Sequence, residues 1–244
     1  GRINQPEHAE EILRSGKADI VNLGRALIAD PEWPNKAASG QAKEIMPCIS
    51  CNKGCHDPTK KVRHTLCLVN AQAGRERGFD ITPVDKAKKV MVVGGGPAGL
   101  EAARVAAIRG HRVTVYEKQQ RLGGRWYLGS QVPRKEHFYG VIEHLRDQAL
   151  KHGAQIELGR TITVADIKAI NPDVVIVATG ASPIVPPIPG ANQDFVVTSD
   201  QVLDGSAQVG KKVVIVGGGS CGAETADFLR LRGKKVTVVE MLDT

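Results

Sequence analysis

Aromatic side chains are scarce in this sequence: they make up 4% of its 244 residues and include only two tryptophans. Proteins that bind single-stranded nucleic acids stack the bases on exposed aromatic rings. We therefore expect no nucleic-acid partner, although the formal net charge is +7. A basic balance also suits small molecules with phosphate groups, and the run "KKVRH" at 60–64 is interpreted as a solvated loop.

Long apolar runs are absent as well. No stretch approaches the roughly 18–20 apolar residues that cross a bilayer. The first ten residues, "GRINQPEHAE", have no apolar core of the kind found in secretory signals. We therefore expect no membrane span and a cytoplasmic location. With 41% hydrophobic and 24% charged residues, the composition is that of a soluble globular protein with one large domain or two ordinary ones.

Cysteines are few, but four of the five stand close together in the pattern C-x2-C-x3-C-x11-C, formed by Cys48, Cys51, Cys55 and Cys67. Disulfides are rare in the cytosol. A structural zinc site usually has two C-x2-C pairs, or one pair with two histidines. Three thiols on one loop with a fourth farther on are typical of a 4Fe-4S cluster. The spacing therefore favours such a cluster over zinc or four unrelated thiols, and we expect Gly54 to turn the loop tightly around a sulfide.

Two segments of the chain, 88–118 and 211–241, resemble each other. Each predicts a buried parallel strand, a helix that ends at a glycine (Gly110 or Gly233), and a second strand followed by an acid. Between strand and helix, each has glycines in the spacing G-x-G-x-x-G. These glycines are Gly94, Gly96 and Gly99 in the first unit, and Gly217, Gly219 and Gly222 in the second.

This spacing is that of a dinucleotide site. The first glycine permits the turn, the second lets the backbone approach a pyrophosphate, and the third lets helix and strand pack closely. The helix N-terminus attracts the phosphates, and the acid, Glu117 or Glu240, accepts hydrogen bonds from a ribose. One such motif is weak by itself, but two complete units in one chain indicate two dinucleotides.

Two further motifs suggest which dinucleotide each unit binds. "LGGR" at 122–125 resembles the second flavin-contacting loop of two-dinucleotide flavoproteins. Ala178-Thr179-Gly180 resembles the ATG sequence at the edge of their FAD domain. This resemblance implies FAD in the first unit and a nicotinamide nucleotide in the second. Cys221, in the second glycine loop, is interpreted as a small residue beside a phosphate. The residues that the resemblance places at FAD are Gly94, Gly96, Pro97, Ala98, Gly99, Glu117, Lys118, Gly124, Arg125, Ala178, Thr179 and Gly180.

The segment before the cysteines, "ADIVNLGRALIADPEWPNKAASGQ" at 18–41, predicts a buried strand, then Gly24 and Arg25, then a turn and a short helix. Followed by the cysteines and the two dinucleotide units, it resembles the iron–sulfur branch of the Old Yellow Enzyme-like flavoproteins. That branch contains 2,4-dienoyl-CoA reductase, 2-enoate reductase and trimethylamine dehydrogenase. The resemblance covers essentially the whole chain. It implies that Gly24 and Arg25 hold the phosphate of FMN at the end of a (β/α)8 barrel.

The resemblance also implies a function. We expect an NAD(P)H-dependent oxidoreductase that passes electrons from NAD(P)H to FAD, the 4Fe-4S cluster, FMN and finally an activated C=C bond of a dienoyl-CoA or enoate. One alternative is an amine dehydrogenase or N-demethylase, in which FMN oxidises the amine and the cluster passes electrons to a carrier protein. Another is an electron-transfer subunit without a substrate site. Because the Glu240 carboxylate would repel the 2′-phosphate of NADPH, we expect NADH to be preferred to NADPH.

The expected fold is α/β, with four parts along the chain. These are the last part of an FMN barrel (1–43), a cluster-binding segment and linker (44–84), an FAD domain (85–190) and the start of an NAD(P)H domain (191–244). Only the last strands of the barrel are expected, and the closing FAD segment of the family is missing, so we interpret the chain as a piece of a longer polypeptide. The sequence predicts no catalytic residues and no oligomeric state.

Overall fold

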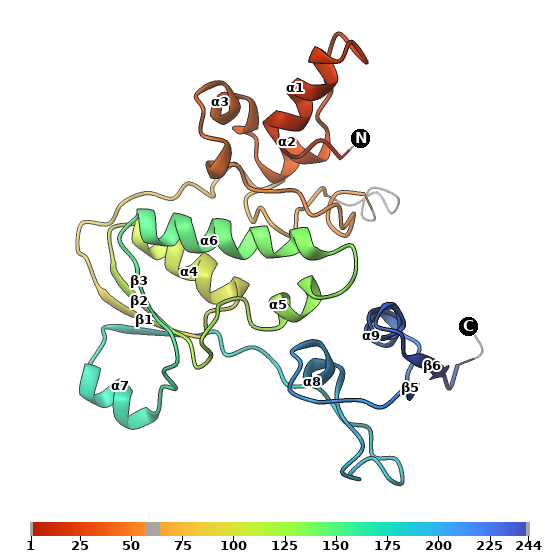
Figure 1. The fold of residues 1–244 in the computed structure, drawn as a ribbon. Coiled ribbons are helices and arrows are strands. Elements are labelled where there is room, and N and C mark those ends of the chain that lie inside the picture. Colours follow the sequence, from red (N-terminus) through yellow and green to blue (C-terminus); the bar gives the residue numbers. More distant parts are fainter. Residues whose placement is uncertain (1, 57–63, 243–244) are drawn as a thin grey trace.

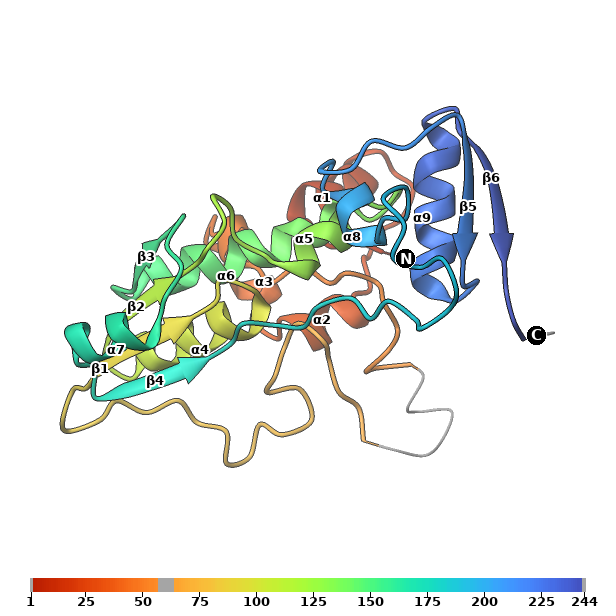
Figure 2. The same ribbon diagram turned by 90° about the horizontal axis from the view of Figure 1, so that it is seen from below.

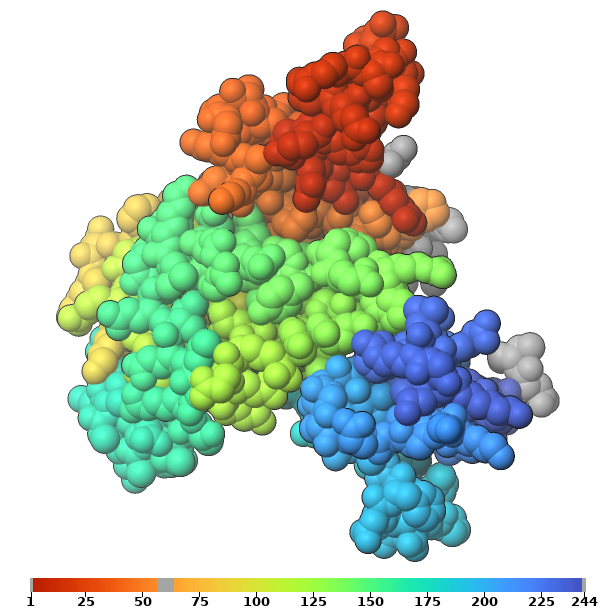
Figure 3. Space-filling model, in the orientation of Figure 1, coloured from red at the N-terminus to blue at the C-terminus, as the bar shows by residue number. Residues whose placement is uncertain are grey.

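The computed structural model describes residues 2–56 and 64–242, so most of the basic run at 60–64 lies outside the described residues. Figure 1 shows an N-terminal helical part, a central part with a sheet and long helices, and a C-terminal part beside it. Figure 3 shows the N-terminal and C-terminal parts on different sides of the central part. No helix in the described ranges is long and apolar enough to cross a membrane.

The N-terminal part consists of short helices, α1 (Pro6–Arg14), α2 (Arg25–Ala29), α3 (Trp33–Ala38) and the 3-10 turn η1 (Ala42–Glu44). Asp30, only 4% exposed, joins them. Its carboxylate accepts hydrogen bonds from the Lys36 ammonium at 2.6 Å and from the backbone N–H of Met46 at 2.8 Å. The predicted short helix after Arg25 is thus present, and a buried acid holds it against the segment that leads to the cysteines.

The buried strand expected ahead of Gly24 is not there, and this prediction was wrong. Residues 20–23 have no regular secondary structure, and the Ile20 side chain is 83% exposed. A parallel strand is stabilised by hydrogen bonds to neighbouring strands, and the described part of the chain places none beside these residues.

The central part is built on a parallel sheet with the strand order β3-β2-β1-β4. Its elements in chain order are β1 (Lys89–Val93), α4 (Pro97–Ile108), β2 (Arg112–Tyr116), α5 (Arg125–Ser130), η3 (Glu136–Phe138), α6 (Tyr139–Lys151), β3 (Gln155–Glu157), α7 (Val164–Ile170) and β4 (Val174–Val177). Helices α4 and α6 lie side by side on one face of the sheet (Figures 1 and 2). Val92, Val115 and Ala103 form the core between the sheet and these helices, and each is completely buried.

The C-terminal part contains α8 (Ser199–Leu203), β5 (Lys212–Val216), α9 (Ser220–Leu231) and β6 (Lys235–Val239), with β5 and β6 paired in parallel. Both repeated segments are therefore strand–helix–strand units, as the sequence predicted. The first strand of the second unit is not buried as expected, however, because Val214 and Val216 of β5 are 64% and 65% exposed. The helices also end as predicted, because Gly110 and Gly233 directly follow their C-caps with positive φ values of 88° and 75°.

Candidate functional site

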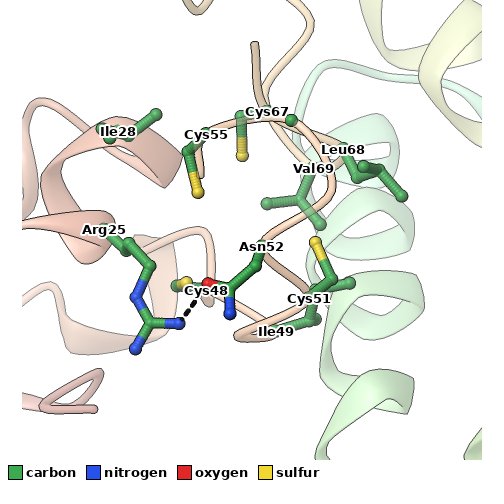
Figure 4. A pocket seen from close by; sticks show the side chains of 11 residues that line it. Arg25, Ile28, Cys48, Ile49, Cys51, Asn52, Cys55, Cys67, Leu68 and Val69 are labelled. Atoms are coloured by element: carbon green, nitrogen blue, oxygen red, sulfur yellow. Dashed lines mark hydrogen bonds between the residues drawn. The ribbon is translucent and has the colours of Figure 1, made fainter. Parts of the chain in front are cut away.

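Four cysteines that are spread over 20 residues of sequence line one small pocket (Figure 4). The pocket is lined by Arg25, Ile28, Cys48, Ile49, Cys51, Asn52, Gly54, Cys55, Cys67, Leu68 and Val69. The structure thus brings together all four thiols that the sequence singled out. Ile28, Ile49, Leu68 and Val69 form much of the remaining wall, and the four cysteines are half-buried.

Backbone contacts bring the two cysteine segments together. The N–H of Leu66 donates to the carbonyl of Gly54 at 2.7 Å, which places Cys67 beside Cys55. A Cβ atom on Gly54 would collide with the Leu66 carbonyl. The missing side chain of Gly54 therefore permits the close approach of two segments, and the expected turn around a sulfide stays a prediction.

The cysteine loop itself has an unusual backbone. Ser50 and Asn52 have φ values of 56° and 60°, in the left-handed region that few residues other than glycine and asparagine adopt readily. The N–H of Ser50 points to the sulfur of Cys48, at 3.4 Å. Such N–H groups around sulfur stabilise thiolate ligands and tune the metal that they bind.

The environment of Cys67 favours the neutral thiol when no metal is bound. Burial raises the pKa of Cys67, and the nearby Cys48 and Cys51 raise it further, while the backbone N–H groups of Val69 and Asn70 lower it. A metal binds the thiolate, so metal binding would release the proton of Cys67.

The four thiols are a ligand set that suits either a zinc ion or a 4Fe-4S cluster. Within residues 2–56 and 64–242, no three histidine, cysteine or acidic side chains are placed to hold a metal ion. The choice of a 4Fe-4S cluster therefore rests on the cysteine spacing and on the resemblance, and it stays a prediction.

The glycines of the first dinucleotide unit lie where the sequence placed them. Gly94 follows β1 with φ 114°, and Gly96 caps α4 ahead of Pro97. A Cβ on Gly99 would collide with the carbonyl of Gly94, so the third glycine permits the close approach of helix and strand. Ala98, in the first turn of α4, is exposed. The start of this helix is therefore open to a phosphate group.

The other predicted FAD residues gather at the same edge of the sheet. Glu117, 6% exposed, accepts hydrogen bonds from the N–H groups of Gly95 at 2.7 Å and Gln119 at 2.9 Å. Gly123 donates to the carbonyl of Gly95 at 2.9 Å, which places the "LGGR" loop over the first glycine turn. The remaining predicted contacts lie in or next to this edge: Lys118 and Gly124, and Ala178, Thr179 and Gly180, which follow β4.

Arg125 has a partner that the sequence did not indicate. Its guanidinium pairs with Asp200 of α8 at 3.1 Å, and Lys135 pairs with Glu224 of α9. These two ion pairs join the central and C-terminal parts. No sequence motif predicts these ion pairs, because ion pairs between units far apart in sequence depend on how the units pack.

The second dinucleotide unit has the same local geometry. Gly217 has φ 104°, Gly219 caps α9, and a Cβ on Gly222 would collide with the Gly217 carbonyl. Glu240 accepts a hydrogen bond from the N–H of Gly218 at 2.6 Å. Hydrogen bonds from the backbone N–H groups of Leu242, Gly218 and Met241 lower the pKa of the exposed Glu240 carboxyl, so it is ionised at neutral pH. Cys221 is exposed in the first turn of α9 and lies outside the cysteine pocket.

An apolar cluster connects the cysteine pocket to the first dinucleotide unit. Ile49 of the cysteine loop packs in one buried group with Leu100, which follows Gly99, and with Leu122, the first residue of the "LGGR" loop. The side chain of Cys51 packs against this group. One of the four thiols is therefore in contact with the core beneath the predicted FAD site.

Comparison with known proteins assigns this arrangement to a class, the flavin-dependent oxidoreductases. Residues 88–244 match the family described as pyridine nucleotide-disulphide oxidoreductase, to which the chain belongs. Residues 1–44 match the family described as NADH:flavin oxidoreductase / NADH oxidase. Along the chain, the NADH:flavin oxidoreductase match comes first and the pyridine nucleotide-disulphide oxidoreductase match follows. This order confirms the resemblance to the Old Yellow Enzyme-like iron–sulfur flavoproteins.

Individual relatives cover nearly the whole chain. It is 46% identical to an NADH oxidase from Thermoanaerobacter brockii over 99% of its length, and 43% identical to a bilirubin reductase from Mediterraneibacter gnavus over 100%. A solved structure of 2-naphthoyl-CoA reductase with 2-naphthoyl-CoA superimposes with a TM-score of 0.93 at 38% identity, over 97% of this chain. The chain spans 38% of the length of the two relatives and 36% of the solved structure.

Proposed function

We propose that this chain is the electron-transfer part of an NADH-dependent reductase that passes electrons from NADH through FAD, a 4Fe-4S cluster and FMN to an activated C=C bond. Its small-molecule substrate would be an enoate or an enoyl-CoA-type thioester. The cluster supplies single-electron transfer, which links the two-electron chemistry of the nicotinamide to that of the second flavin.

The single observation behind this proposal is that Cys51 belongs to two environments. It lines the pocket of four thiols, and it packs against the apolar group that contains Leu100 and Leu122 at the first dinucleotide unit. A cluster held by these thiols would therefore be adjacent to the FAD unit with no solvent layer between them.

The residues of the chain have distinct tasks in this proposal. Glu240 orients the nicotinamide nucleotide at the second glycine turn, and Glu117 orients FAD at the first. Cys48, Cys51, Cys55 and Cys67 hold the cluster. Arg25 lines the cluster pocket on the side of the N-terminal helices, while Gly24 caps α2. The prediction that these two residues hold the FMN phosphate stays a prediction.

The test is reduction of the cluster by NADH. The full-length protein is prepared anaerobically with its iron, sulfide and flavins, and NADH is added while the visible spectrum is recorded. We expect the flavin absorbance to bleach first. The broad absorbance of the cluster near roughly 400 nm should then bleach as well. In Cys51→Ala, FAD should still be reduced while the cluster band is missing. Flavin reduction without any cluster reduction in the unaltered chain would contradict the proposed electron path.

A second measurement addresses the direction of electron flow. In the full-length protein, an enoate or enoyl-CoA thioester should reoxidise the NADH-reduced cluster. An amine that reduces the oxidised cluster instead would favour the dehydrogenase alternative.

A further inference from the structure

A single cation is built into the wall of the cysteine pocket. Among the described residues that line this pocket, Arg25 is the only one with a positively charged side chain. Its Nη1 donates a hydrogen bond of 2.7 Å to Oδ1 of Asn52, and Figure 4 shows the guanidinium and this amide beside Cys48. The charge therefore lies in the wall of the pocket, next to Cys48.

Asn52 presents its amide to Arg25 because of the local backbone. It lies between Cys51 and Cys55 and has φ 60°, a conformation in which asparagine is well tolerated. Its carbonyl accepts the N–H of His56 at 3.1 Å, which closes the turn. The hydrogen bond to Arg25 thus ties the middle of the cysteine loop to helix α2.

The helix that begins at Arg25 is itself held firmly. Ala26 and Ala29 of α2 are 5% and 3% exposed. The side-chain amide of Asn70, three residues after Cys67, donates to the carbonyl of Ile28 at 2.9 Å. Both cysteine segments are therefore attached to α2, one through Arg25 and the other through Ile28, so the guanidinium stays at the pocket.

We propose that Arg25, positioned by Asn52, sets the reduction potential of the cluster. This inference rests on the proposed function, since it presumes that the four thiols hold a 4Fe-4S cluster. Reduction adds one electron, and hence one negative charge, to the cluster and its thiolates. A cation fixed in the wall of the pocket stabilises this reduced form more than the oxidised form, so it raises the potential. A more easily reduced cluster accepts electrons from FAD more readily.

The experiment compares matched variants of the 244-residue chain after anaerobic reconstitution with iron and sulfide. Arg25→Gln removes the charge, Arg25→Lys keeps it without the planar donor group, and Asn52→Gly removes the amide while permitting the positive φ. Arg14→Gln is the control, because it removes one positive charge from the exposed end of α1, where Arg14 pairs with Glu10. The midpoint potential is measured by dithionite titration followed by electron paramagnetic resonance, together with bound iron and sulfide.

We expect Arg25→Gln to disfavour reduction at least tenfold, which for one electron is a decrease of about 59 mV in potential. Arg25→Lys and Asn52→Gly should lower the midpoint potential by a smaller amount. Arg14→Gln should change the reduction equilibrium by less than twofold. The inference is overturned if Arg25→Gln matches the unaltered chain, or if Arg14→Gln shifts the potential equally. If Arg25→Gln retains no iron, an unchanged potential in both Arg25→Lys and Asn52→Gly overturns it. An unaltered chain that binds no iron and sulfide refutes the proposed function, and this inference with it.

Discussion

The carboxylate of Glu240 accepts a hydrogen bond of 2.6 Å from the backbone N–H of Gly218, as Glu117 does from Gly95 at 2.7 Å. In both units the acid after the second strand is therefore fixed against the glycine turn after the first. The two acids differ in exposure, since Glu117 is buried and Glu240 is exposed. The second site thus offers a fixed, ionised and accessible carboxylate to a ribose.

This carboxylate predicts a preference for NADH over NADPH. A 2′-phosphate would bring two negative charges towards Glu240, whereas a ribose hydroxyl would donate to it. In the full-length protein, with an artificial electron acceptor, we expect kcat/KM to be higher for NADH than for NADPH. Glu240→Ala should bring the two kcat/KM values closer together. A tenfold or greater preference for NADPH, about 1.4 kcal/mol, would be incompatible with this role. Asp194→Asn is the control, because Asp194 is exposed in the segment between β4 and α8. It should leave the ratio of the two kcat/KM values unchanged.

Metal analysis should distinguish the clustered cysteines from the fifth. Anaerobically prepared chain is expected to hold about four irons and four sulfides. Cys51→Ala should lose both, because a ligand and its contact with the apolar group are removed together. Cys221→Ser is the matched control, since Cys221 lies outside the pocket, and it should keep full iron and sulfide. Stoichiometric zinc without labile sulfide would disprove the cluster assignment.

Close packing at the third glycine predicts a stability difference between two glycine-to-alanine variants. In Gly99→Ala the new Cβ meets the carbonyl of Gly94, a backbone atom that cannot move aside easily. We expect a loss of about 2 kcal/mol or more in the free energy of unfolding. Gly129→Ala is the control: Gly129 lies in α5, and a Cβ there meets nothing within 4 Å. It should be neutral or stabilising by up to about 1 kcal/mol. Urea unfolding of both variants measures the difference, and equal midpoints would show that the helix–strand approach is not tight.

A histidine on α6 predicts that acid destabilises the fold. His144 lies near Lys36 and Arg104 and also near Asp30 and Glu44, and its Nδ1 is buried without a hydrogen-bond partner among the described residues. Burial, reinforced by the two cations, lowers the pKa of His144 and outweighs the two acids. Between the lowered folded pKa and the unfolded value of about 6.5, the unfolded chain binds more protons. Stability contributed by the neutral imidazole is therefore lost as the pH falls below about 6.5.

The measurement is urea unfolding at several pH values from 7.5 to 5. We expect the free energy of unfolding to decrease on acidification, and His144→Asn to flatten that decrease. His152→Asn, at the exposed end of the same helix, should leave the slope as it is. A slope that His144→Asn does not change would mean that other groups cause the pH dependence.

The sequence by itself determined both strand–glycine–helix–strand units and the set of four thiols. These features depend on contacts between near neighbours, where a missing Cβ at Gly99 or Gly222 and the spacing of Cys48, Cys51 and Cys55 are already informative. The prediction of a buried strand within residues 18–23 was wrong, because an apolar run forms a strand only when other strands lie beside it. Only the tertiary structure decided that Arg25 hydrogen-bonds Asn52 in the wall of the cysteine pocket, that Gly54 is needed for close approach to Leu66, and that Arg125 pairs with Asp200. Each of these contacts joins segments whose separation is set by how whole elements pack, and no local pattern encodes that distance.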